Sequence, residues 1–206
     1  MRSRGLLVFL ALIVCAAPLA ARGNKPAPTA PGTYKEWGPD IDEMEIVKTF
    51  RMADYDKVVV LPFDTAEVPL PDAKEKSYDS IKSVLEGYTP TLVEALKPEL
   101  KASAEVDRAD KAPKSAKTLL VRGKVLQLSP GSRAKRYLAG YGAGAAGTKI
   151  TGELVDANSG QVLARFTQER RSGGTWKFAG GNDMEVMRDS IHATGKDIAH
   201  MLDAFD

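Results

Sequence analysis

TKITGELVDANSGQVLARFTQ, residues 148–168, decides the fold of this 206-residue chain. Apolar and polar residues alternate on both sides of DANSG, with Ile150 and Leu154 before it and Ala164 and Phe166 after it. Strict alternation indicates strands that bury one face, and a short connection of Asp, Asn and Gly favours a tight turn. We therefore predict a β-hairpin over these residues.

The segments on either side of the hairpin predict a sheet covered by helices. TLLVRGKVLQL (residues 118–128) and the apolar run at 58–61 indicate two more strands. Apolar residues recur at three- and four-residue steps over 81–100, which predicts a helical face, and Thr89 before Pro90 predicts a break into two helices. The same spacing predicts a C-terminal helix from about Asp183, in which Gly195 allows close approach to the sheet. The fold class is α/β (α+β), a mixed sheet with helices packed on it in a single compact domain.

A glycine-rich stretch, GYGAGAAGTK (residues 140–149), leads into the hairpin. Gly142, Gly144 and Gly147 match the G-x-G-x-x-G of a dinucleotide-binding turn. Such a turn binds pyrophosphate because a helix follows it and directs its N-terminus at the ligand. Here a predicted strand follows the glycines. We therefore expect that this stretch binds no nucleotide.

Two interpretations of these glycines remain open. In the structural one, they let backbones approach closely or adopt positive φ. In the functional one, the side chains beside them contact a partner protein or lipid headgroups. A second loop, GGTWKFAGG (residues 173–181), presents aromatic residues between glycines and admits the same two interpretations. The candidate contact residues are Arg133, Arg136, Tyr137, Gly140, Tyr141, Gly142, Gly144 and Trp176.

The N-terminus predicts export. Arg2 and Arg4 precede nine consecutive apolar residues, the length of a signal-peptide core and too short to span a bilayer. Cys15 is the only cysteine, and Leu12 stands three residues before it as in lipoprotein signals, although Val14 replaces the usual small residue. Lipidation at Cys15 and ordinary cleavage after an alanine between 17 and 21 both remain open. In either case we expect a location in the periplasm or on the periplasmic face of the outer membrane.

Composition divides the chain into three parts. We assign residues 1–21 to the signal peptide, with a lipoprotein signal ending before Cys15 as the alternative. Residues 22–44, rich in Pro, Gly and Ala, are assigned to a flexible tether, and 45–206 to the single α/β domain. The chain carries 29 basic and 27 acidic residues. Such a balance lacks the concentrated basic face that nucleic acid requires, so we expect no nucleic-acid partner.

Patterns of catalytic or metal-binding residues are missing from the sequence. His192 and His200 share the predicted C-terminal helix without a third ligand at metal spacing, and no G-x-S-x-G elbow occurs. We therefore expect no cofactor, no metal and no enzymatic activity, and a protein that acts by binding an envelope protein or the membrane surface. The alternative is a small-ligand-binding or hydrolytic periplasmic domain that uses a cleft near the glycine-rich turn.

Taken together, YDKVVVLPF, VRGKVLQLSPGSRAKRYLAGYGAGAAG and GELVDANSGQVLARF resemble the bacterial family catalogued as domain of unknown function 4410. The resemblance implies an exported protein, often a lipoprotein, with a fold similar to the α/β domains of curli-secretion and Tol-system periplasmic proteins. It implies no activity, because none is established for the family. The residues that carry the resemblance are Gly131, Ser132, Arg133, Arg136, Tyr137, Gly140, Tyr141, Gly142, Ala143, Gly144, Asp156 and Gly160.

Overall fold

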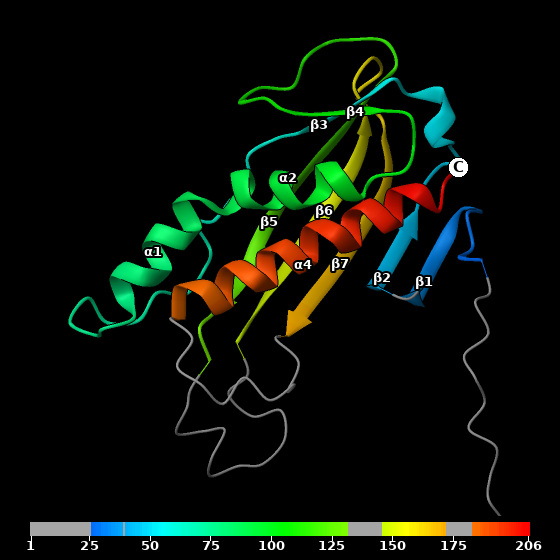
Figure 1. Ribbon diagram of the computed structural model, residues 1–206. Helices are drawn as coiled ribbons and strands as arrows, with labels where there is room; N and C mark the ends of the chain where they lie inside the picture. The colour runs from blue at the N-terminus through cyan, green and yellow to red at the C-terminus, as the bar shows by residue number, and fades with distance from the viewer. Residues whose placement is uncertain (1–25, 39, 132–145, 172–182) are drawn as a thin grey trace, which may run out of the picture.

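The computed structural model describes residues 26–38, 40–131, 146–171 and 183–206. Within these ranges, seven strands form one sheet and three α-helices pack on one of its faces (Figure 1). The strands are β1 (Gly32–Trp37), β2 (Ile41–Ile46), β3 (Lys57–Val60), β4 (Glu105–Arg108), β5 (Thr118–Ser129), β6 (Gly147–Asp156) and β7 (Val162–Arg171). The helices are α1 (Tyr78–Glu86), α2 (Tyr88–Glu99) and α4 (Asp183–Asp203), with a short 3-10 turn, η1 (Met52–Asp54).

The sheet is mixed, as the sequence predicts. Its strand order is β1-β2-β7-β6-β5-β3-β4. β3 pairs in parallel with β4 and β5, and all the other neighbouring strands are antiparallel. The predicted hairpin is formed by β6 and β7. Its turn is closed by Asp156, whose Oδ1 accepts hydrogen bonds from the Ser159 N–H at 2.7 Å and the Ser159 hydroxyl at 2.6 Å. Gly160 follows with a φ of 73°, which favours glycine.

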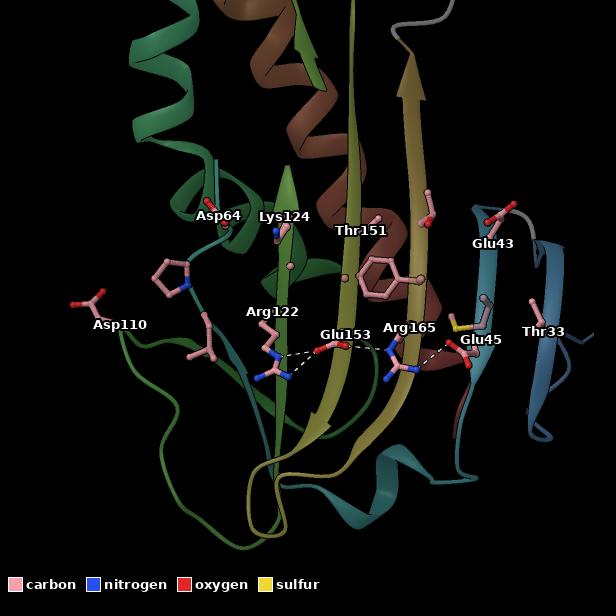
Figure 2. Close-up of a pocket in the computed structure, with 17 residues that line it drawn as sticks. Thr33, Glu43, Glu45, Asp64, Asp110, Arg122, Lys124, Thr151, Glu153 and Arg165 are labelled. Carbon is pink, nitrogen blue, oxygen red and sulfur yellow. Dashed lines mark hydrogen bonds and ion pairs between the residues drawn. The ribbon is translucent and has the colours of Figure 1, made fainter. Parts of the chain in front are cut away.

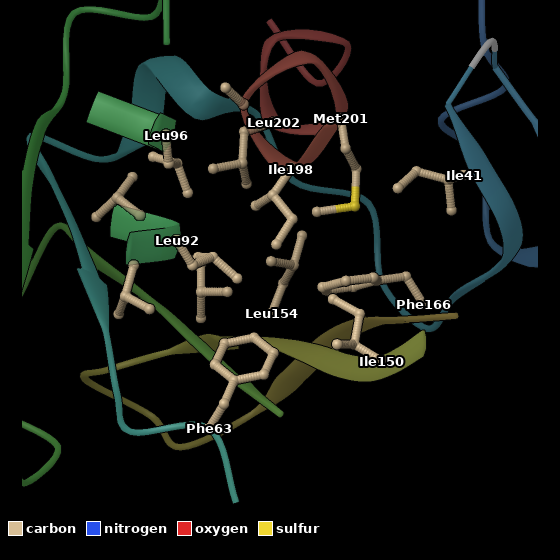
Figure 3. Packing of buried hydrophobic residues seen from close by; sticks show 14 of the residues in the cluster. Ile41, Phe63, Leu92, Leu96, Ile150, Leu154, Phe166, Ile198, Met201 and Leu202 are labelled. Carbon is tan, nitrogen blue, oxygen red and sulfur yellow. The ribbon is translucent and has the colours of Figure 1, made fainter. Parts of the chain in front are cut away.

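The hydrophobic core lies between the sheet and the helices (Figure 3). Leu96 of α2 and Ile198 of α4 are fully buried in the same cluster as Ile150 and Leu154 of β6. The predicted C-terminal helix is confirmed as α4. Each helix in the described ranges falls short of the length or the apolar character needed to cross a bilayer.

Two neighbouring glycines let aromatic rings pack closely against the centre of this sheet. Gly123 of β5 pairs with Gly152 of β6, and Gly152 pairs with Phe166 of β7. A Cβ added at Gly152 would lie 2.3 Å from the Phe166 ring, and one at Gly123 would lie 2.6 Å from the Phe63 ring. Such distances are far below ordinary contact, so both positions require glycine.

The predicted tether is too long at its C-terminal end, because β1 and β2 lie within or across residues 22–44. Trp37 is 2% exposed and stacks on Phe205 at a centroid distance of 5.4 Å. Met44 is fully buried, and it pairs with Phe166 of β7. From composition alone, this segment was not expected to bury enough apolar surface to be ordered. In the structure, its apolar side chains are buried because β2 pairs with β7 and Trp37 packs on Phe205.

Two details of the helices also differ from the sequence prediction. The break between α1 and α2 falls at Gly87, so Thr89 lies inside α2, where its Oγ1 accepts a 2.9 Å hydrogen bond from the Phe63 N–H. Pro90 is tolerated in the first turn because its missing N–H has no partner there. Gly195 approaches α2 and not the sheet, since a Cβ there would lie 2.5 Å from the Leu92 carbonyl oxygen.

Candidate functional site

The face of the sheet opposite the helices forms an open trough of about 870 Å³ (Figure 2). Its floor is made by β2, β7, β6 and β5. Asp64 and Asp110 lie along the β5 side, and Thr33 of β1 lies along the other. Side chains alternate between the two faces of a strand, so the positions between the core residues of these strands carry the trough's polar groups.

A ladder of alternating charges crosses four strands on this floor. Glu45 of β2, Arg165 of β7, Glu153 of β6 and Arg122 of β5 are direct cross-strand neighbours. Arg165 Nη1 donates to Glu45 Oε2 at 3.0 Å, and its Nε donates to Glu153 Oε1 at 3.1 Å. Arg122 donates to Glu153 Oε2 through Nε at 2.9 Å and Nη2 at 2.7 Å. Each charge therefore has an opposite charge beside it, which stabilises the register of the sheet.

The ladder fixes the ionised form of its central carboxylate. Burial opposes ionisation of Glu153, but the hydrogen bonds from Arg122 and Arg165 outweigh burial and lower the pKa of Glu153. The hydrogen bonds that Arg165 donates to Glu45 and Glu153 in turn raise the pKa of Arg165. Both shifts favour the charged forms of Glu153 and Arg165, so the centre of the ladder is suited to recognition by fixed charges.

A second row of polar side chains runs beside the ladder and is mostly unpaired. Thr167 of β7 and Thr151 of β6 are cross-strand neighbours. Next to them on β5, Lys124 donates to Glu67 Oε1 at 2.6 Å. At the β2 end of the row, the side chain of Glu43 has no hydrogen bond or ion pair with any residue that the structure describes. The row therefore offers hydroxyls and a carboxylate to whatever enters the trough.

The trough continues toward one end of the sheet. A second depression of about 500 Å³ shares Glu43 and Thr167 with it and adds Lys149, Glu169 and Arg171. At this end, Gly147 pairs with both Ser129 and Arg171. The chain leaves the described ranges just after Ser129 and Arg171 and re-enters just before Gly147, so the glycine-rich segments 132–145 and 172–182 are attached at the same end of the sheet (Figure 1).

All the contact residues proposed from the sequence lie outside the described ranges. The strand expected after the glycine-rich stretch is present as β6, which leaves no helix N-terminus to hold a pyrophosphate at that point. The residues outside the described ranges are Cys15, Arg133, Arg136, Tyr137, Gly140, Tyr141, Gly142, Gly144 and Trp176.

The two histidines lie away from the trough. His200 Nδ1 is 3.1 Å from Asp40 Oδ2, and His192 is partly buried on α4. Among the described residues, no three His, Cys, Asp or Glu side chains are grouped as metal ligands. Two carboxylates of the segment after β3 do lie at the trough: Asp64 lines it, and Glu67 pairs with Lys124 there.

Sequence reasoning missed the charge ladder. A signal was present, because Arg122, Glu153 and Arg165 occupy alternate positions of predicted strands, opposite the apolar face. Their pairing depends on strand order and register, which the sequence pattern does not specify. Glu45 could not be placed in a strand from the sequence, because β2 begins inside the segment assigned to the tether.

Comparisons with known proteins identify the family of the chain. No curated protein matches it. A PelC dodecamer structure from Paraburkholderia phytofirmans is 18% identical, over 75% of this chain and 96% of that one, with a TM-score of 0.44. Protein XCC0632 from Xanthomonas campestris is 12% identical over 76% and 91%, with a TM-score of 0.44. Lipoprotein GNA1162 from Neisseria meningitidis is 15% identical over 70% and 98%, with a TM-score of 0.34. Residues 45–174 match the model of the family described as "Domain of unknown function (DUF4410)", which confirms the resemblance seen in the motifs: the chain belongs to this family.

Proposed function

We propose that this chain is an exported bacterial cell-envelope protein that acts without catalysis, by binding another envelope protein over the uncovered face of its sheet. The observation that carries the proposal is the trough, which joins an ordered floor of charges to the end of the sheet where both glycine-rich segments are attached. The signal-peptide pattern at residues 1–21 supports export.

The chemistry of the trough favours binding over catalysis. Its arginines are engaged by Glu45 and Glu153, and Lys124 is engaged by Glu67. A general acid or base needs a pKa near the working pH, and the pairing of Glu153 moves its pKa in the opposite direction. A floor of fixed charges with hydroxyls beside it is suited to the polar rim and hydrogen bonds of a protein interface.

The same surface favours a protein over a lipid bilayer as the partner. Interfacial membrane binding needs a contiguous apolar face. Among the described residues, the only large hydrophobic side chains that are exposed are Val47 and Leu70. Neither residue lines the trough.

Site-specific photocrosslinking in intact cells tests the proposal. A photoreactive residue replaces Thr151 on the floor of the trough, and a matched one replaces Asp189 on the exposed side of α4. We expect Thr151 to yield a discrete protein adduct and Asp189 to yield none. Adducts from Asp189 alone, or lipid adducts from Thr151, would contradict a protein partner in the trough.

The glycine-rich segments need a separate test, because contact and structural roles predict different results. Tyr141→Ala and Trp176→Ala are measured for both the Thr151 adduct and the melting temperature. Loss of the adduct at an unchanged melting temperature supports contact. A large fall in melting temperature would show that these aromatic residues are structural.

A second candidate function is small-ligand binding or hydrolysis in the same trough. Its volume and the unpaired Glu43 favour this alternative. Purified protein is assayed with a panel of carboxylic and phosphate esters, beside a Glu43→Gln control. Turnover that Glu43→Gln abolishes, without a Thr151 adduct in cells, would replace the binding proposal.

A further inference from the structure

A buried polar cluster joins α4 to the helix-covered face of β7. Asp197 of α4 is 1% exposed and Gln168 of β7 is 3% exposed. Gln168 Nε2 donates to Asp197 Oδ2 at 2.6 Å, and Arg170 Nη2 donates to Asp197 Oδ1 at 2.6 Å. A carboxylate buried this deeply is tolerated only because both of its oxygens accept hydrogen bonds.

The cluster extends to the turn between β1 and β2. Asp40 of that turn lies 3.6 Å from Arg170 Nη2 through Oδ1 and 3.1 Å from His200 Nδ1 through Oδ2. Arg170 therefore stands between two carboxylates, with Asp197 on α4 the closer and Asp40 on the turn the more distant. Asp40 thus adds a contact from Arg170 of β7 and His200 of α4 to the hairpin formed by β1 and β2, beside the pairing of β2 with β7 and the stacking of Trp37 on Phe205.

Two buried atoms in the cluster have no partner among the described residues, namely Gln168 Oε1 and Arg170 Nε. An ionised Asp197 only accepts hydrogen bonds, so it cannot serve Gln168 Oε1. A protonated Asp197 gains an O–H that can donate to this oxygen. In the ionised state Gln168 Oε1 therefore lacks a donor among the described residues, and a proton on Asp197 adds an O–H donor to the cluster.

We propose that this cluster is a pH-sensitive latch, in which a solvent proton taken up by Asp197 releases Arg170 from α4 to Asp40 and so tightens the hold on the β1–β2 hairpin. The other charged groups nearby are His200, Glu99 and Lys196. His200, when protonated, adds a positive charge beside Asp40. Glu99 of α2 lies near His200 and is itself paired with Lys196.

The titration of Asp197 sets the direction of the effect. Burial raises the pKa of Asp197 from 3.8 to about 6, and Asp40 adds to the rise, while Arg170 and Gln168 oppose it. A pKa raised by folding means that the fold favours the protonated form. The resulting stabilisation is complete below the unfolded value of 3.8 and is lost as the pH rises through about 6. Linkage of these two pKa values makes the unfolding constant about tenfold larger at pH 7.5 than at pH 5.

The latch also bears on the trough, because the hairpin carries Glu43 and Glu45 on β2. A tighter hairpin holds that side of the trough more firmly at acidic pH. This consequence for binding rests on the proposed function, whereas the latch itself does not. The tests below therefore use the purified chain and no partner.

The first test is urea denaturation at pH 5 and pH 7.5 of wild type, Asp197→Asn and a matched control, Asp189→Asn, which removes an exposed carboxylate of the same helix. We expect wild type and Asp189→Asn to show the tenfold ratio of unfolding constants, and Asp197→Asn to lose it. A ratio that Asp197→Asn leaves unchanged overturns the proposal. Should Asp197→Asn not fold, carboxyl NMR titration of the wild type replaces it, and an Asp197 midpoint near 4 overturns the proposal.

The second test separates the latch from global stability. Hydrogen exchange of the β2 amides, corrected for intrinsic rates, is compared at both pH values in wild type and in Asp40→Asn. We expect the β2 amides of wild type to be several-fold more protected at pH 5, and Asp40→Asn to remove this gain while the β6 amides stay unaffected. Equal protection of β2 at both pH values would show that the cluster titrates without latching the hairpin.

Discussion

The contact between Gly152 and Phe166 makes a sharp prediction about the centre of the sheet. In Gly152→Ala, the new Cβ would lie 2.3 and 2.5 Å from two atoms of a ring that is 3% exposed. The ring must move by about 1 Å in a close-packed core, and overpacking of this kind costs about 1–3 kcal/mol. Removing glycine from a strand returns about 0.5–1 kcal/mol, so we expect a net loss of about 1–2 kcal/mol in the free energy of unfolding.

A shorter side chain at position 166 should relieve this clash. Phe166→Leu alone is expected to cost about 1–2 kcal/mol from lost apolar burial. In that background Gly152→Ala should gain about 0.5–1 kcal/mol, because the clash is gone and only the benefit of replacing a strand glycine remains, which gives a coupling energy of about 1–3 kcal/mol in a double-mutant cycle. Urea denaturation followed by circular dichroism measures all four proteins.

A neighbouring glycine provides the matched control. A Cβ at Gly123 would lie 2.3 Å from the carbonyl oxygen of Thr151, which Phe166→Leu does not remove. Phe166→Leu should therefore not rescue Gly123→Ala. If the effects of Gly152→Ala and Phe166→Leu add to within about 0.5 kcal/mol, the ring does not require the glycine and the reasoning fails.

Three further predictions test other contacts. Arg165→Gln should raise the pKa of Glu153 toward its ordinary value of 4.5. Glu153 then contributes less to the free energy of unfolding above pH 4.5, so acidification below that pH should cost the variant less stability than the wild type. An unchanged pKa of Glu153 in a carboxyl NMR titration would refute the role of the ladder. Tyr88→Phe removes a 2.9 Å hydrogen bond to Thr148 and leaves a buried hydroxyl unpaired, so urea denaturation should show a loss of about 1–3 kcal/mol, and a neutral result would mean that water replaces the bond. Gly195→Ala should cost about 1–3 kcal/mol by separating α4 from α2, and an unchanged melting temperature would show that the helices shift freely.

Much of the fold could be predicted because its signals are local. The β6–β7 hairpin has alternating residues and a turn of Asp, Asn and Gly, and α4 has an apolar stripe over many turns. These patterns need no knowledge of the rest of the chain. The structure confirms the mixed sheet and the helices on it for the same reason.

β1 and β2 escaped prediction because their evidence is tertiary. GTYKEW and IDEMEI are mostly polar, and their burial appears only once β2 pairs with β7 and Trp37 meets Phe205. The charge ladder has the same limit, since Glu45, Arg165 and Glu153 become neighbours only through strand order and register. Local patterns therefore predict elements, whereas this site arises between elements.

The pairing of β2 with β7 also affects the order in which the chain can fold during its synthesis and transport. Glu45 and Arg165 are 120 residues apart, yet they lie side by side. A ribosome makes β1 and β2 early, but the strand that receives them is nearly the last to be made, and Phe205, which stacks on Trp37, comes later still. A nascent chain therefore holds a hairpin of β1 and β2 whose β2 edge has no partner until β7 and α4 arrive. Any chaperone or transport machinery that takes the chain N-terminus first must keep those strands apart from other sheets for most of that time.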